Sequence, residues 1–110
     1  MAFSGVHVAF GFAFTTGDVG LFGAVWSQTL SASGTTTNAA VGLQFSSPIR
    51  GDASPCFEVR AQQDCYVAVG ATPDASQTIG TDGAARVPVG AGETRHIPCK
   101  PGDKLAVVLV

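Results

Sequence analysis

Charge is scarce in this 110-residue sequence. Lys, Arg, Asp and Glu make up 13% of it, against roughly 25% in an ordinary soluble domain, and the formal net charge is −2. The six cations are scattered and form no basic stripe, so we expect no nucleic-acid partner. A chain of this length suffices for one domain with a two-layer core, and we expect residues 1–110 to form a single domain.

Long apolar runs and cysteine pairs are also missing. No apolar run reaches the length that a membrane-spanning helix needs, so we expect no membrane partner. The apolar N-terminal run has no Lys or Arg before it, and we expect it to belong to the fold rather than to a secretory signal. The three cysteines form no CxxC pair and the glycines form no phosphate loop. We therefore expect no metal, no cofactor and no disulfide scaffold, and synthesis in a reducing compartment.

The charges that are present lie almost entirely in the second half of the sequence. Of the 6 basic and 8 acidic side chains, only Asp18 falls within residues 1–49. A free surface usually carries interspersed charge. A half of the sequence with so little charge must therefore be sheltered by its own fold or by other subunits. We interpret residues 1–49 as an assembly half and expect a homo-oligomer. The alternative is a Ser- and Thr-rich surface over a well-buried apolar face.

Alternation of apolar with small or polar side chains predicts strands through most of the chain. The clearest case is residues 6–14, where the valines and phenylalanines share one face and Gly, Ala and His occupy the other. A turn signal at residues 15–18 leads into the apolar stretch 19–26, which predicts a hairpin. No stretch favours a helix. Further strands are expected at 41–45, 56–61, 65–70, 85–89, 95–99 and 105–110.

Turn residues and prolines constrain how these strands pair. Residues 100–103 place Pro101 and Gly102 at the second and third positions of a type II turn, and residues 90–93 form another turn. Pro88 and Pro98 cannot donate ladder hydrogen bonds, so their strands should lie at a sheet edge or carry a bulge. Together these features predict an all-β fold, an antiparallel two-sheet β-sandwich of jelly-roll or related Greek-key type. Its expected core includes Phe10, Phe12, Leu43, Phe57, Val67, Val69, Val87, Ile97, Leu105 and Val107.

Residues 31–40 contain hydroxyls and a glycine but no large apolar side chain, so we expect a loop or an extended arm there. Trp26 ends the second apolar stretch beside this segment, and we expect a protein partner to contact it. The candidate subunit interface therefore combines the first strand, this tryptophan and the polar segment. Its predicted residues are Phe10, Phe12, Phe14, Trp26, Thr35, Thr36, Thr37 and Asn38.

Groups that could carry catalysis are few. His96 and Cys99 are three residues apart, which in a strand points them to opposite faces, so a nucleophile–base pair would need a bulge. We expect His7 to be packed or to lie at an interface. Most carboxylates fall in predicted turns, and the Arg-Gly-Asp tripeptide at residues 50–52 is interpreted as a solvated turn. We therefore predict no catalytic residue and no enzymatic activity.

Three segments of the second half resemble a group of small structural proteins of tailed-bacteriophage heads. These are residues 64–76 (DCYVAVGATPDAS), residues 89–95 (VGAGETR) and residues 101–107 (PGDKLAV). They are similar to that group's strand with a GxxP loop, its AGE turn and its terminal strand. The resemblance covers about residues 56–110 and part of 26–40, whereas residues 1–25 have no counterpart in it.

The resemblance implies a virion component on the capsid surface, made in the host cytoplasm. A cement or decoration protein of this kind bridges neighbouring copies of the major capsid protein, and a trimer would fit a capsid three-fold position. The alternative within the virion is an adaptor at the tail, the neck or the base of a head spike or fibre. An alternative of another class is a carbohydrate-binding attachment module, which would require exposed aromatic rings.

Overall fold

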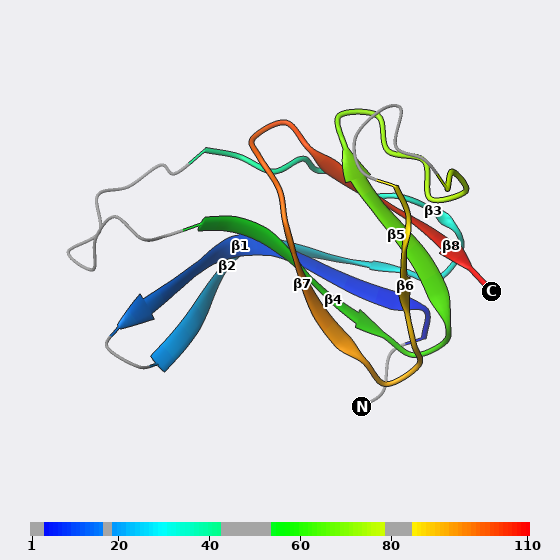
Figure 1. The fold of residues 1–110 in the computed structure, drawn as a ribbon, viewed down its shortest axis with the longest axis horizontal. Helices are drawn as coiled ribbons and strands as arrows, with labels where there is room; N and C mark the ends of the chain where they lie inside the picture. Colours follow the sequence, from blue (N-terminus) through cyan, green and yellow to red (C-terminus); the bar gives the residue numbers. More distant parts are fainter. Residues whose placement is uncertain (1–3, 17–18, 43–53, 79–84) are drawn as a thin grey trace.

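The computed structural model describes residues 4–16, 19–42, 54–78 and 85–110. These residues form eight strands (Figure 1). No helix able to cross a membrane is found among them. The strands are β1 (Val6–Thr16), β2 (Val19–Leu30), β3 (Gly34–Thr35), β4 (Ser54–Ala61), β5 (Cys65–Gly70), β6 (Val87–Val89), β7 (Thr94–Pro98) and β8 (Lys104–Leu109).

The strands form two four-stranded antiparallel sheets that pack face to face. The first sheet, which we call sheet A, has the order β2-β1-β4-β7, and the second, sheet B, has the order β3-β8-β5-β6. All of the described strand pairs are antiparallel. The prediction of an all-β two-sheet sandwich is therefore confirmed.

The strand pairs also identify the winding of the chain as a jelly roll. One arm of a folded ribbon runs β2-β3-β4-β5 and the other runs β6-β7-β8-β1, so that β5 pairs with β6, β4 with β7, β3 with β8 and β2 with β1. In this ribbon β1 occupies the position that would otherwise follow β8. Gly5 and Val110 both bond to the β4–β5 turn, through Gln62 and Asp64, so β1 begins where β8 ends.

The core lies between the sheets and draws on both halves of the sequence. Val6, Val8, Phe10 and Phe12 of β1 share one buried face, as the alternation predicted. They pack with Phe57 and Val59 of β4 and with Val67, Val69, Leu105 and Val107 of sheet B. Among the other predicted core residues, Val87 and Ile97 are partly buried against this cluster, and Leu43 lies outside the described residues.

Two predicted strand boundaries differ from the structure. The second strand does not end at Trp26 but continues to Leu30, because Gln28 and Leu30 keep the inward alternation with polar residues between them. The strand predicted at residues 41–45 is not found at Val41 and Gly42, and the rest of that segment lies outside the described residues.

The predictions made from proline and from turn chemistry are confirmed. Pro88 lies in β6 and Pro98 in β7, which are edge strands of sheet B and sheet A. The 100–103 turn closes with a 3.1 Å bond from the Asp103 amide to the Lys100 carbonyl, and Gly102 has a φ of 93°. The 90–93 turn has the same form, because Gly92 has a φ of 83° at the third position.

A β-bulge interrupts the pairing of β1 with β2. Phe10 lies opposite Trp26 but Gly11 lies opposite Ala24, so Val25 is an extra residue in β2. The backbone of β2 approaches β1 so closely at this point that a Cβ on Gly11 would collide with the carbonyl group of Gly23. The bulge therefore requires glycine at position 11, whereas Gly23 itself has open space around it.

We expect Gly11→Ala to destabilise the fold by about 1–3 kcal/mol, because the added methyl group meets backbone that must shift. Gly23→Ala is the matched control, since a Cβ at position 23 meets nothing within 4 Å. Chemical denaturation with a tryptophan fluorescence readout measures both. Equal midpoints for the two variants would contradict this account of the bulge.

Candidate assembly surface

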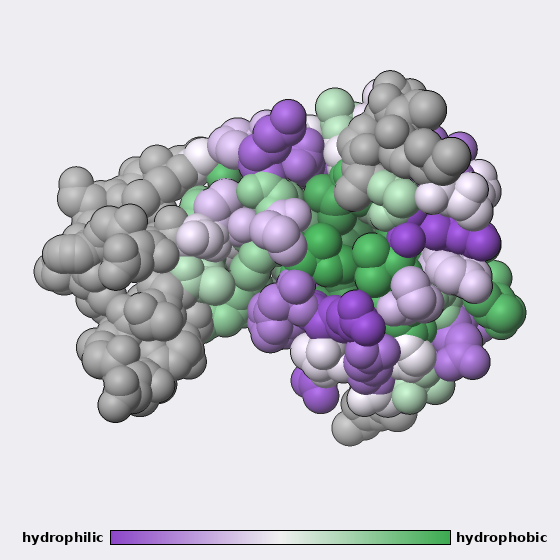
Figure 2. Space-filling view, viewed as in Figure 1, coloured by the Kyte–Doolittle hydropathy of each residue, from purple (hydrophilic) through white to green (hydrophobic). Residues whose placement is uncertain are grey.

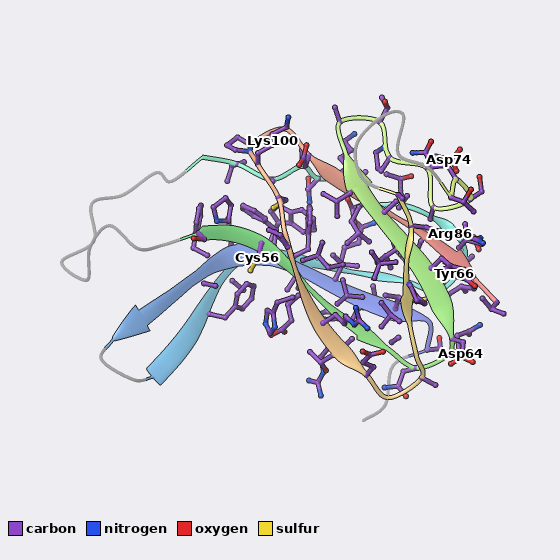
Figure 3. The ribbon with its side chains drawn as sticks, viewed as in Figure 1. Cys56, Asp64, Tyr66, Asp74, Arg86 and Lys100 are labelled. Carbon is purple, nitrogen blue, oxygen red and sulfur yellow. The ribbon has the colours of Figure 1, made fainter. Side chains whose placement is uncertain are left out.

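The three strands of the first half carry no Lys, Arg, Asp or Glu. The charged side chains of the described residues belong to β4–β8 and their connections. In Figure 3 the labelled charged residues Asp64, Asp74, Arg86 and Lys100 lie away from the tip of the β1–β2 hairpin. The uneven charge along the sequence is thus also uneven in space, and we call the described surface of residues 4–42 the neutral surface.

Over the residues that the structure describes, the β1–β2 pairing is longer than the β1–β4 pairing. The pairing of β1 with β4 ends at Ala13 and Ser54, whereas the pairing with β2 continues to Thr16 and Val19. Among the described residues, the end of the hairpin therefore pairs only within itself (Figure 1). Phe14, a predicted contact, belongs to this end of β1, and its side chain lies outside the described part of the chain.

The segment that follows β2 is not a detached arm. Residues 34–35 form β3, which pairs with β8, and the backbone continues in contact with the β7–β8 turn. The Ala40 amide donates to the Asp103 carbonyl at 2.7 Å, and the Gly102 amide donates to the Ala40 carbonyl at 2.8 Å. Thus backbone hydrogen bonds hold a segment that has no large apolar side chain.

Two buried polar side chains support this connection. The Thr36 hydroxyl donates to the Asn38 carbonyl at 3.0 Å and accepts the Leu105 amide at 3.2 Å. The Asp103 carboxylate accepts the Lys100 amide at 3.0 Å. Both side chains are thus hydrogen-bonded within the fold, as buried polar groups must be.

The predicted contact residues divide into two groups. Phe10, Phe12 and Thr36 are buried within the fold, so their prediction as surface contacts is corrected here. Thr35, Thr37 and Asn38 are exposed, and the Thr37 amide donates to the Gln28 side chain at 2.9 Å. These three residues lie on the neutral surface, and their role as contacts stays a prediction.

The Trp26 side chain makes most of its contacts within the fold. Its ring lies 6.0 Å from the rings of both Phe10 and Phe57, and its indole N–H donates to the Ala39 carbonyl at 3.1 Å. The side chain is partly buried and joins β2 to the segment after it. Alanine at this position would remove core contacts as well as any contact with a partner.

Val25, which was not among the predicted contact residues, is the most exposed large hydrophobic side chain on the neutral surface. Its exposed fraction is 49%, and Val110 is the other large hydrophobic residue that is exposed among the described residues. Val25 protrudes because the bulge takes it out of the alternation that buries Trp26. The sequence does contain a signal for this bulge, because Val25 and Trp26 are adjacent apolar residues inside an otherwise alternating strand.

The outer face of sheet A is smooth near β2 and charged farther away. Residues that pair across strands share a face, so the register defines its rows. One row contains no charge and consists of Ala24, Gly11, Cys56 and Pro98. Charge begins in the following row, where the His96 Nε2 of β7 lies 3.0 Å from a Glu58 carboxylate oxygen of β4.

The opposite edge of the molecule carries ionic interactions. The Arg95 guanidinium donates to Glu93 at 2.7 Å, and the Gly90 amide donates to the same carboxylate at 2.8 Å. These bonds hold the pKa of Glu93 below its ordinary value. Hydrophilic residues gather over β7 in Figure 2. This edge therefore differs chemically from the edge formed by β2.

The histidine and cysteine considered as a catalytic pair do not form one. The His96 ring packs against the Phe22 ring, with centroids 5.6 Å apart, and bonds to Glu58. Cys99 instead packs against the core, where burial, with Asp103 and Cys56 adding to the effect, raises its pKa to about 12. A thiol in this environment remains protonated and is a poor nucleophile.

The aromatic rings do not form a sugar-stacking pair in the described part of the chain. Tyr66 of β5 has the guanidinium carbon of Arg86 4.0 Å from its ring centroid (Figure 3). Trp26 is engaged with Phe10 and Phe57, as described above. The Arg-Gly-Asp tripeptide at residues 50–52 lies outside the described residues.

Comparisons with protein families, with curated proteins and with solved structures found no match to the chain.

We expect Thr36→Val to destabilise the fold by about 1–3 kcal/mol, because it removes one buried and one part-buried hydrogen bond and leaves the Leu105 amide with one partner fewer. Thr35→Val is the control, since Thr35 is the preceding residue, at the end of β3, and is exposed. Thermal or urea unfolding measures both variants. A loss of the same size in the control would show that the hydroxyl of Thr36 has no special role.

Proposed function

We propose that this chain is a non-enzymatic structural protein of a tailed-bacteriophage head, which cements the capsid by bridging neighbouring copies of the major capsid protein. It would act on the capsid surface of the virion after synthesis in the host cytoplasm. Buried area and backbone pairing, rather than chemical conversion of a ligand, would provide its activity.

The observation that carries this proposal is the separation of the neutral surface from the charged remainder of the sandwich. A surface without charged side chains loses little electrostatic solvation when a partner covers it. Among the described residues, the β1–β2 pairing carries that surface beyond the last β1–β4 pair, Ala13 and Ser54. The assignment to phage heads rests on the resemblance of the segments at residues 64–76, 89–95 and 101–107.

An adaptor at the tail, neck or spike base is the second candidate, because the same resemblance includes it. The two candidates differ in stoichiometry. A cement protein would be present in a fixed ratio to the major capsid protein over the whole lattice, whereas an adaptor would be present only at one ring or one set of vertices. A carbohydrate-binding module receives less support, because the Trp26 and Tyr66 rings already have partners within the chain.

Quantitative mass spectrometry of purified particles, with the major capsid protein as internal standard, tests the proposal. We expect a copy number on the scale of the capsid lattice. A copy number on the scale of one ring would favour the adaptor, and absence from washed particles would contradict a virion role.

Binding of purified variants to heads that lack the chain tests which surface makes the contact. We expect Thr37→Lys to reduce occupancy, because it places a charge on the neutral surface that the partner must desolvate. Thr72→Lys is the matched control, since Thr72 is also exposed but lies in the β5–β6 connection. Reduced occupancy in the control alone would place the contact on sheet B instead.

A further inference from the structure

A two-sheet sandwich has four edge strands, and three of them here carry features that prevent strand addition. β3 is only two residues long. β6 is three residues long and contains Pro88, and β7 contains Pro98 together with Arg95. Short length, proline and charge are the usual means by which proteins protect sheet edges.

The fourth edge, β2, has none of these three features. It is 12 residues long and contains no proline and no charged residue. Among the described residues its backbone pairs with β1 alone. The segment at residues 36–42 does not take the other side, because its backbone bonds to β8 and the β7–β8 turn, and it reaches β2 through the side chains of Trp26 and Gln28.

We propose that β2 pairs in antiparallel orientation with β2 of a second copy of this chain, across a two-fold axis, to join two A sheets into one continuous sheet of eight strands. Two identical strands that run antiparallel satisfy two-fold symmetry without any further adjustment. This inference gives the homo-oligomer expected from the sequence the form of a two-fold dimer. It concerns the free protein as well as the capsid-bound one of the proposed function.

The position of Val25 defines the register of this pairing. Full overlap of two 12-residue strands places the two-fold axis at the midpoint of β2, between Ala24 and Val25. The two bulges then lie opposite each other, and the two exposed Val25 side chains meet near the axis. A bulge can also interrupt the hydrogen bonding of an edge strand to a new partner. When the two bulges lie opposite each other, neither bulge falls against a regular stretch of the partner strand.

Two copies of the chain meet with little charge repulsion at this edge. The chain has a net charge of −2, so most ways of bringing two copies together oppose like charges. Pairing through β2 leaves β1 and β2 of both copies at the centre and places the charges of β4 and β7 on the outside of the joined sheet. An edge contact is small, so we expect a dissociation constant on the order of micromolar.

Sedimentation over a range of protein concentrations tests the pairing, with Val25→Lys as the disrupting variant. We expect the wild type to form a dimer. The dimer dissociation constant of Val25→Lys should be at least about tenfold higher, because lysine introduces like charges at the axis. Val110→Lys is the matched control, since Val110 is the other exposed large hydrophobic residue and lies just after β8. A wild-type monomer at high concentration, a wild-type trimer, or a Val25→Lys dimer as strong as the wild type would overturn the proposal.

Oxidative cross-linking tests the register with variants that need not lose stability. Val25→Cys should form a disulfide-linked dimer, because the two residues at position 25 lie beside each other across the axis, offset by one position. Thr29→Cys should not, because in this register Thr29 lies far along the strand from its copy. The wild type controls for the three native cysteines. Cross-linking of Thr29→Cys but not of Val25→Cys would exclude this register.

The tests of the β2 pairing and of the proposed function can fail independently of each other. A dimer that does not bind heads would leave the β2 pairing intact and remove the cement role. Head binding at lattice stoichiometry by a chain that stays monomeric in solution and does not cross-link through Val25→Cys would do the reverse.

Discussion

Burial of the inner face of β1 is the interaction on which the rest of the structure depends. Val6, Val8, Phe10 and Phe12 fill the centre of the core, and β1 lies between β2 and β4 in sheet A. In the wound ribbon of the jelly roll, β1 also occupies the place that follows β8. The first strand therefore connects the neutral first half to the charged second half, and neither half has a complete core without the other.

This arrangement also determines which surface is available to partners. Because β1 is internal to its sheet, its hairpin partner β2 becomes an edge strand. Within the described part of the chain, this longest strand pairs on one side only. The segment after β2 is fixed through Thr36, Ala40 and Asp103, so it closes the sandwich beside β2. The part of the neutral surface at residues 34–42 is thus held in place by the fold, which lowers the conformational entropy lost when a partner binds there.

Local patterns in the sequence predicted the sandwich and much of its core, since alternation at residues 6–14 and the positions of Pro88 and Pro98 each have a local physical cause. The candidate surface was harder to predict. Thr36 is buried because it bonds to Leu105, 69 residues away, and nothing in the neighbouring sequence indicates that contact. Trp26 was expected to face a partner, but its ring is held by Phe10 and Phe57. Val25 became visible only once the register revealed the bulge.

Hydrogen–deuterium exchange at low and high protein concentration tests most directly whether the open edge of β2 is where the chain assembles. The account predicts that backbone amides of β2 become more protected as concentration rises, while those of the edge strands β6 and β7 do not change. Protection of β2 that is independent of concentration, or a concentration-dependent change confined to β6 and β7, would contradict it.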